Sequence, residues 1–236
     1  MKAMIFAAGL GSRMMPLTAH CPKPLLPLAG KPLIEYHLEK IADCGISDVV
    51  INVSYLADQI IQAIGDGSRW GLSIQYSIES EPQETYGGLL QAQNLLMLKA
   101  REPLLLINAD VYCDVDFANF TREACDCLRE GGLGFLLMAK NPEHNLKGDF
   151  SLSFDNLDSI ARLKKFNPKN DATFSGISVL LPALLGRYEM KTKRLSEMLV
   201  NAIQEQQLFA TLHTGEWHDI GTPERLQLIE NQLASQ

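Results

Sequence analysis

The chain has 236 residues, of which 46% are hydrophobic, and it carries a formal net charge of −7 at pH 7. A chain of this length and apolar content can bury a substantial core, which favours one α/β domain over two small ones. The negative charge provides little attraction to nucleic acid or to an anionic membrane surface, so we expect neither as a partner. Any phosphate site must therefore be local.

The five cysteines are odd in number and form no CxxC pair. This usage fits a reducing compartment better than a disulfide framework. Lys2–Phe6 is not followed by the apolar stretch of a signal peptide, and no apolar run reaches the length of a membrane span. We therefore expect a cytoplasmic protein. Cys125 and Cys127 lack a second ligand pair for zinc, so we expect a helical pair with one buried member.

Short apolar runs in the first part of the chain alternate with segments that have apolar residues at helical spacing. This alternation predicts βαβ units and a Rossmann-like, mostly parallel sheet that is flanked by helices on both faces. The expected strands are Ala3–Ala8, Asp48–Val53, Leu72–Ser77, Pro103–Asn108 and Leu133–Met138, and the expected helices cover residues 33–41, 56–64 and 89–96.

After Gly148 the pattern changes to strands with fewer helices between them, which is typical of an α+β arrangement. Three strands are expected first, then a helix, a strand and a final amphipathic helix. Their ranges are Asp149–Phe154, Ser159–Phe166, Thr173–Leu181, Leu195–Glu205, Leu208–His213 and about Thr222–Ala234.

A glycine-rich loop follows the first strand directly. Gly9 and Gly11 permit positive φ angles and a close approach to a ligand, so the amides from Leu10 to Arg13 can point at phosphate oxygens. The guanidinium of Arg13 can contact phosphate with two hydrogen bonds, whereas Lys23 supplies a compact charge. Together these features predict a nucleoside triphosphate site.

The loop sequence matches neither the dinucleotide fingerprint GxGxxG nor the P-loop GxxxxGK[ST], which disfavours both of those nucleotide-binding classes. A strand followed by GxG is weak evidence on its own, because a tight βα turn has the same pattern. A simple βα turn without a phosphate site is disfavoured by the spacing of the residues that follow, namely Arg13, Pro16, Leu17, Thr18 and the Lys23–Pro24 pair.

The segments Gly9–Thr18 (GLGSRMMPLT) and Pro22–Leu38 (PKPLLPLAGKPLIEYHL) resemble the N-terminal signature of the sugar-1-phosphate nucleotidyltransferases. These enzymes join a nucleoside triphosphate to a sugar 1-phosphate and release pyrophosphate. The similarity extends from Met1 to about Leu233, and is greatest to short bacterial members that use UTP and N-acetylmuramate α-1-phosphate in peptidoglycan recycling.

This resemblance implies a GT-A-like fold formed by one domain over residues 1–236. Residues from about 1 to 140 would form the nucleotide-binding half, and residues from about 141 to 236 a smaller sugar-binding half that supplies a second metal ligand. Arg13 and Lys23 would be catalytic, through direct attack of the sugar phosphate on the α-phosphorus. The implied nucleotide contacts are Ala7, Ala8, Gly9, Leu10, Gly11, Ser12, Arg13, Lys23, Glu81 and Gly87.

Asp110 follows a predicted strand, at the edge of the sheet where open α/β folds bind their ligands. Mg²⁺ takes oxygen ligands and uses one or two carboxylates together with substrate phosphates. Asp219 is the candidate partner, although its place near Thr222 and Pro223 also suits a loop or helix-capping role. The resemblance implies that Asp110 and Asp219 hold Mg²⁺.

The loop Glu81–Ala92 is expected to read the base. Glu81 can accept a hydrogen bond from the uracil N3–H, with Glu79 and Glu84 as competing candidates. Guanine N1–H would satisfy a carboxylate equally well. Tyr86 replaces a smaller residue of the family pattern, so close backbone approach is expected at Gly87 and Gly88. The implied sugar contacts are Asn108, Gly148, Asp149 and Ser175, and none is assigned in the segment Lys164–Pro168.

Two alternatives stay open. One is a mannose- or glucose-1-phosphate nucleotidyltransferase that uses GTP, TTP or CTP, and the other is a non-catalytic nucleotide-sugar sensor. No obligatory protein partner is inferred. The histidines form no metalloprotease or Ser/His/Asp pattern, so we expect His20, His37, His144 and His213 at surface or packing positions.

Overall fold

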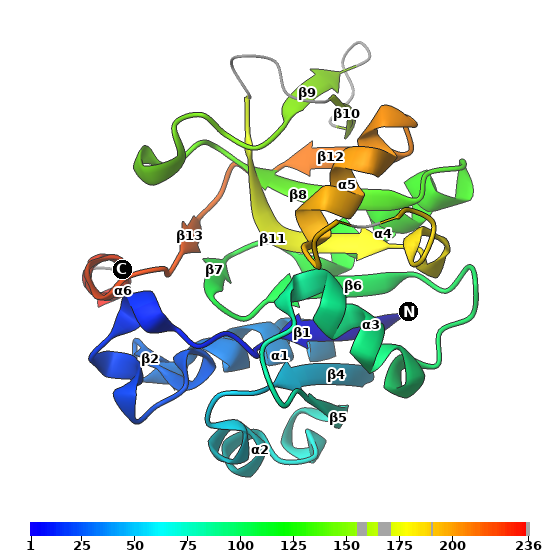
Figure 1. The fold of residues 1–236 in the computed structure, drawn as a ribbon. Coiled ribbons are helices and arrows are strands. Elements are labelled where there is room, and N and C mark those ends of the chain that lie inside the picture. Colours follow the sequence, from blue (N-terminus) through cyan, green and yellow to red (C-terminus); the bar gives the residue numbers. More distant parts are fainter. Residues whose placement is uncertain (155–159, 165–170, 190, 235–236) are drawn as a thin grey trace.

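A mixed sheet of nine strands forms the centre of the molecule (Figure 1). The computed structural model describes residues 1–154, 160–164, 171–189 and 191–234. The strands of the sheet are β1 (Lys2–Phe6), β4 (Asp48–Val53), β5 (Ser73–Ile78), β6 (Leu104–Asn108), β8 (Gly134–Ala139), β9 (Ser151–Phe154), β10 (Ile160–Lys164), β11 (Thr173–Leu180) and β12 (Leu208–Leu212).

The strand order is β5-β4-β1-β6-β11-β8-β12-β10-β9. The first four strands are parallel to their neighbours, as the alternating pattern predicts. β11 then pairs antiparallel with both β6 and β8, and β12 pairs parallel with β8. The predicted fold class is confirmed, and a single sheet passes through both halves of the chain.

Five helices cover the two faces of this sheet. They are α1 (Leu33–Asp43), α2 (Ala57–Ile64) and α4 (Phe117–Arg129) on one face, and α3 (Glu84–Leu96) and α5 (Leu195–Gln204) on the other. Because side chains alternate along a strand, Ala3 and Ile5 of β1 pack in the first core and Met4 packs in the second. Cys127 of α4 is buried and Cys125 is half-buried, as expected for a helical cysteine pair.

Two short elements outside the sheet bring distant segments together. β7 (Val111–Cys113) follows β6 and pairs antiparallel with β13 (Trp217–Asp219), so that Asp219 lies opposite Val111. The last helix, α6 (Pro223–Ala234), packs near the hairpin of β2 (Pro27–Leu28) and β3 (Lys31–Pro32). The sequence predicts α6 but not β7 or β13, because three residues are too few to reveal an alternating pattern.

The C-terminal helix also supports the glycine-rich loop. Met14 of that loop is fully buried in a small apolar cluster with Leu28, Ile220 and Ile229. This cluster therefore fixes the loop and the end of β13 to one another through side chains that are far apart in sequence. Within the described ranges, no helix combines the length and apolar character that crossing a membrane requires.

Candidate active site

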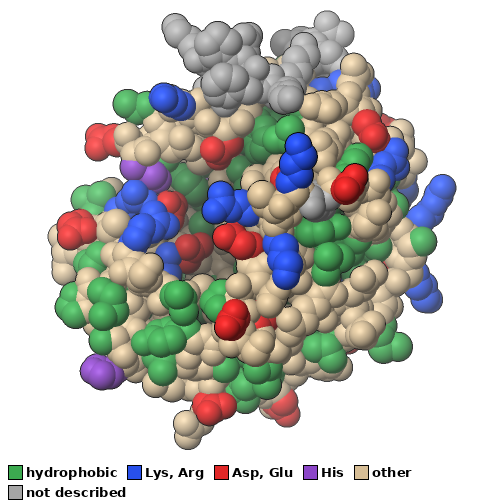
Figure 2. Space-filling model, viewed as in Figure 1, with side chains coloured by type: hydrophobic (Ala, Val, Ile, Leu, Met, Phe, Trp, Pro, Cys, Tyr) green, Lys and Arg blue, Asp and Glu red, His purple; other side chains and the backbone are tan. Residues whose placement is uncertain are grey.

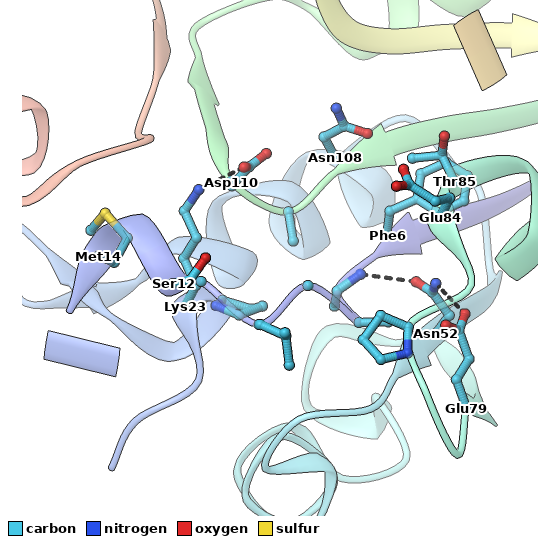
Figure 3. Close-up of a pocket in the computed structure, with 18 of the residues that line it drawn as sticks. Phe6, Ser12, Met14, Lys23, Asn52, Glu79, Glu84, Thr85, Asn108 and Asp110 are labelled. Atoms are coloured by element: carbon cyan, nitrogen blue, oxygen red, sulfur yellow. Dashed lines mark hydrogen bonds and ion pairs between the residues drawn. The ribbon is translucent and has the colours of Figure 1, made fainter. Parts of the chain in front are cut away.

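A cavity of about 460 Å³ opens at the carboxyl ends of β1, β4 and β6. Figure 2 shows acidic and basic side chains around a hollow on this face of the molecule. The glycine-rich loop forms one wall of the cavity and the start of α3 forms another (Figure 3). Of the predicted nucleotide contacts, the lining includes Ala7, Ala8, Gly9, Leu10, Gly11, Ser12, Arg13 and Lys23.

The glycine-rich loop depends on one glycine for its backbone conformation. Gly11 has a φ of 63°, and a Cβ there would lie 2.9 Å from Thr18 Cγ2. The Gly11 carbonyl accepts hydrogen bonds from Thr18 Oγ1 at 2.9 Å and from the Met14 amide at 2.8 Å. Gly9 does not adopt a positive φ, contrary to expectation. A Cβ at Gly9 would meet no protein atom within 4 Å, so its bare backbone leaves room for a ligand.

A buried hydrogen-bonded bridge spans the floor of this cavity (Figure 3). Asn52 Oδ1 accepts from the Ala7 amide at 2.9 Å, and Asn52 Nδ2 donates to Glu79 Oε1 at 2.7 Å. Glu79 Oε2 accepts from the Gln83 amide at 2.8 Å. Asn52 and Glu79 are each only 3% exposed, so these bonds are well shielded from water. The bridge thus joins the glycine-rich loop to the entry of α3.

The bridge also changes the assignment of the predicted nucleotide contacts. The Ala7 amide is occupied by Asn52 and is not free for phosphate. Glu79 and Glu84 line the cavity, whereas Glu81 is exposed and lies outside the lining. Gly88 packs against the bridge, since a Cβ there would lie 2.6 Å from Asn52 Nδ2 and 2.6 Å from Glu79 Oε1.

The start of α3 is occupied by a segment of the second half. The amides of Tyr86 and Gly87 donate to the Lys193 carbonyl at 2.9 and 3.3 Å, so Gly87 is not brought to the cavity. Lys193 Nζ in turn donates to Gln83 Oε1 at 2.6 Å. The Tyr86 hydroxyl accepts from the Gly186 amide at 3.0 Å. The Tyr86 side chain therefore adds one hydrogen bond between the two halves of the chain.

Asp110 and Lys23 form the first charged pair of the site. Lys23 Nζ lies 2.6 Å from Asp110 Oδ2, and only about a tenth of the lysine side chain is exposed. The pair joins a residue of the glycine-rich segment to the end of β6, across 87 positions of sequence. Burial of the lysine stem fixes its ammonium at the boundary of the cavity.

A second cavity adjoins the first and contains the other predicted carboxylate. Asp219 lies 2.8 Å from Arg225 Nη1 and 3.3 Å from His144 Nε2, measured at its Oδ2. The Ile220 amide donates to the Asp110 carbonyl at 3.0 Å, so β13 and β7 bring Asp219 close in space to Asp110. Both carboxylates line this second cavity. His144 is exposed, as expected, and it also lines this second cavity.

The second cavity includes three of the four predicted sugar contacts. Asn108, Asp149 and Ser175 line it, whereas Gly148 does not. Gly148 has a φ of 61°, and any Cβ would lie 2.6 Å from Asn141 Oδ1, so it permits the turn that presents Asp149. Asp149 Oδ2 accepts from the Phe174 amide at 2.8 Å. Of the segment Lys164–Pro168, residues 165–168 lie outside the described ranges.

The sequence did not single out the other polar residues of the second cavity. Asn145 and Thr173 lie 3.2 Å apart through Asn145 Nδ2 and Thr173 Oγ1, and Trp217 Nε1 donates to the Ser175 carbonyl at 2.9 Å. These residues come from a short turn and from strand ends, where no local pattern marks a ligand site. Arg13, Asn108 and Asp110 line both cavities, so the two cavities share a wall.

His37 lies behind the site and holds β7 in place. Its Nε2 lies 2.8 Å from the Val111 carbonyl, and its ring stacks on Phe117 with centroids 6.5 Å apart. Burial lowers the pKa of His37 from 6.5 to about 4. The neutral imidazole therefore acts as a packing and hydrogen-bonding residue, as expected from the sequence, one strand position away from Asp110.

Asp110 lies on the wall that the two cavities share, the glycine-rich loop and Lys23 line the first cavity, and Asp219 lines the second. This arrangement of backbone amides, cations and carboxylates is typical of an α/β protein that binds phosphate groups. A family model described as nucleotidyl transferase matches residues 2–146. The chain is 42% identical over 229 residues to an N-acetylmuramate alpha-1-phosphate uridylyltransferase of Neisseria meningitidis, with 96% of each chain covered. The chain thus belongs to the nucleotidyltransferase family, among the sugar-1-phosphate nucleotidyltransferases.

More distant proteins agree with this placement. The chain is 32% identical over 229 residues to a mannose-1-phosphate guanylyltransferase catalytic subunit beta of Drosophila melanogaster, covering 94% of this chain and 60% of the relative. A solved structure from Bacillus anthracis, described as a glucose-1-phosphate thymidylyltransferase, has a TM-score of 0.82 at 19% identity. The structural match covers 98% of this chain and 94% of the Bacillus anthracis chain. At this identity the match shows similarity of fold only.

Proposed function

We propose that this protein transfers the uridylyl group of UTP to N-acetylmuramate α-1-phosphate, forming UDP-N-acetylmuramate and pyrophosphate. The observation that carries the proposal is the 42% identity to the Neisseria uridylyltransferase over 96% of both chains. Because the alignment covers 96% of both chains, the similarity supports the relative's whole activity for this protein and not that of one module alone. A cytoplasmic place in peptidoglycan recycling is part of the same proposal.

The first cavity would bind the nucleotide. Amides of the loop from Leu10 to Arg13 and the Arg13 guanidinium would hold the β- and γ-phosphates, since backbone amides and a planar guanidinium both suit phosphate oxygens. Lys23 would stabilise charge at the α-phosphate, at the boundary with the second cavity. The sugar 1-phosphate in that second cavity is already an anion, so direct in-line attack needs positioning and charge neutralisation but no general base.

Asp110 and Asp219 are proposed to hold Mg²⁺. Their carboxylate oxygens are the donors that this ion prefers, and the cations Lys23 and Arg225 contact those oxygens, as expected for anions that need a positive partner. When bound, the ion would neutralise phosphate charge and thereby favour transfer. The role of Arg225 and His144 would then be to orient Asp219.

For base reading, the cavity lining favours the competing candidates Glu79 and Glu84 over Glu81. Because Glu81 lies outside the cavity lining, the acidic acceptors available to the base are Glu79 and Glu84. Each Glu79 oxygen already accepts one protein hydrogen bond, which leaves one further lone pair on each for a ligand donor. A carboxylate at this place suits the N3–H of uracil.

The alternative substrate pair is mannose 1-phosphate with GTP, which is favoured by the identity to the fly guanylyltransferase. Guanine N1–H would satisfy the same acidic acceptors. Pyrophosphate release measured over a matrix of four nucleoside triphosphates and several sugar 1-phosphates, with Mg²⁺, separates the two. Preference for UTP with N-acetylmuramate α-1-phosphate is expected, and no release with that pair would refute the proposal.

A nucleotide-sugar sensor without turnover is less well supported. A sensor has no need for the two carboxylates, yet Arg13, Lys23, Asp110 and Asp219 all surround the joined cavities. Tight UDP-sugar binding that is independent of Mg²⁺, combined with an absence of pyrophosphate release for every substrate pair, would favour the sensor.

A further inference from the structure

A cluster of three metal-ligating side chains lies outside both cavities, at the far end of the β7–β13 ladder. Cys113 Sγ, a carboxylate oxygen of Asp114 and a ring nitrogen of His213 all lie within 4.8 Å of one another. His213 Nε2 is 2.6 Å from Asp114 Oδ1. None of these residues lines either cavity, and none has a role in the proposed transfer reaction.

The donor atoms of this cluster differ in kind from those proposed to hold Mg²⁺. A thiolate, an imidazole and one carboxylate form a set typical of Zn²⁺ and related transition metals, whereas hard oxygen donors alone suit Mg²⁺. Three protein ligands complete a tetrahedral site when one water joins them. The chemistry of the cluster therefore selects a borderline metal ion that is distinct from the proposed catalytic ion.

Burial distinguishes this cluster from a chance group of surface side chains. Cys113 is 3% exposed, and the side chain of His213 is 13% exposed, whereas that of Asp114 is 47% exposed. The site thus has two shielded ligands and one on the solvent side, which leaves a path for an ion. Burial raises the pKa of the Cys113 thiol to about 11, so the free thiol keeps its proton.

We propose that Cys113, Asp114 and His213 form a Zn²⁺-binding site that clamps the end of β12 to the β7–β13 ladder. Binding would replace the S–H bond of Cys113 by a bond from sulfur to the metal and release the thiol proton to solvent. The nearby positive charge of Lys40, which interacts electrostatically with Cys113 and Asp114, also favours the thiolate.

The position of this cluster gives it a relation to the active site. Cys113 pairs with Trp217 at one end of the ladder, and Val111 pairs with Asp219 at the other. Asp110 immediately precedes β7, so both active-site carboxylates lie at the end of the ladder opposite the cluster. A metal ion that joins β12 to this ladder would restrict the relative movement of Asp110 and Asp219 without touching either.

The test uses Co²⁺ and Zn²⁺ as probes on the full chain after removal of metals with a chelator. Co²⁺ is added in the presence of excess Mg²⁺, which saturates sites made of oxygen ligands alone. A near-ultraviolet thiolate-to-cobalt band that saturates at one equivalent and is displaced by Zn²⁺ is expected. Absence of that band would overturn the proposal directly.

Variants then identify the ligands. Cys113→Ser should abolish the band, and His213→Ala should weaken Zn²⁺ affinity by about tenfold or more, because even the outer-shell partners of metal ligands are worth that much. Cys125→Ser and His20→Ala, which alter residues outside the cluster, are the matched controls and should change neither result. A band that survives Cys113→Ser but disappears in Cys125→Ser would assign the metal to another thiol.

Thermal unfolding offers a second readout that does not depend on transferase activity. Zn²⁺ should raise the midpoint of the full chain and of Asp219→Asn, but not that of Cys113→Ser, since a ligand stabilises only the state that binds it. An equal rise in Cys113→Ser would contradict the site. Circular dichroism of each variant before metal addition checks that it is folded.

Discussion

The two cavities are built in different ways. The first lies at the ends of adjacent parallel strands, where β1, β4 and β6 deliver Asn52, Asn108 and the glycine-rich loop to a single edge of the sheet. The second depends on β7, β13 and short turns that meet only after the chain has folded. Regular topology fixes the first cavity, and a few long-range contacts fix the second.

This difference explains what the sequence could predict. The glycine-rich loop, Lys23 and Asp110 lie beside strands that apolar runs reveal, so local pattern and resemblance both locate them. Asn52 and Glu79 are 27 positions apart, and only the parallel pairing of β4 with β5 brings them together. An isolated Asn at the end of one strand and a Glu after another carry no local signal of a bridge.

The second half shows the same principle more strongly. Asp219 is predicted as a ligand through resemblance, but its partners His144 and Arg225 come from a short turn and from α6. The sequence predicts Glu81 as the base reader, whereas Glu79, directly after β5, lines the first cavity and Glu81 does not. Which of several neighbouring acidic residues faces a ligand is decided by backbone direction, which composition does not reveal.

The strongest test of the shared wall between the cavities removes Lys23, the cation that contacts Asp110 of that wall. Lys23→Ala should lower kcat by about 10²–10³, equivalent to about 2.7–4 kcal/mol, because a preorganised charge is lost. The binding of each substrate should change less than turnover. Lys31→Ala, which removes a lysine from the partly exposed pair with Glu39, should leave the rate unchanged. A Lys23→Ala enzyme with nearly normal kcat would show that Lys23 does not serve catalysis.

The packing role of His37 behind the site is tested by measuring stability as a function of pH. The pKa of His37 is about 4 in the folded protein and near 6.5 when unfolded, so the unfolded state takes up a proton first as pH falls. Protonation of His37 in the unfolded state therefore lowers the free energy of unfolding by about 3 kcal/mol as the pH falls from 6.5 to 4. Urea unfolding of the wild type and His37→Gln across that range should show a shallower pH dependence in the variant, and parallel curves would disprove the assignment.

The bridge in the first cavity is tested by Glu79→Gln, with Glu81→Gln as its matched control. A glutamine side chain has only one acceptor oxygen, so it cannot satisfy the donors of both Asn52 and Gln83, at a cost of about 1–3 kcal/mol. We expect a raised KM for UTP with a smaller change in KM for the sugar phosphate. A larger rise in KM for UTP in Glu81→Gln than in Glu79→Gln would instead favour Glu81 as the base reader.

The smallest expected effect concerns the contact between the halves. Tyr86→Phe removes the acceptor for the Gly186 amide and should lower stability by about 1 kcal/mol in thermal or urea unfolding. Tyr76→Phe removes a hydroxyl that donates to Gly65 within the first half, and it provides a control of similar size. Unchanged stability of Tyr86→Phe would mean that this hydroxyl does not stabilise the contact between the two halves.

The carbonyl of Lys193 has a consequence for how the molecule opens. It accepts hydrogen bonds from the amides of Tyr86 and Gly87, which have no earlier residue within α3 to bond and which directly follow the residues of α3 that line the first cavity. Those two protons can exchange with solvent deuterium only when this carbonyl moves away. Their exchange rates therefore report how often the contact between α3 and Lys193 opens, and a nucleotide that changes those rates would show that binding is coupled to this contact, without any measurement of turnover.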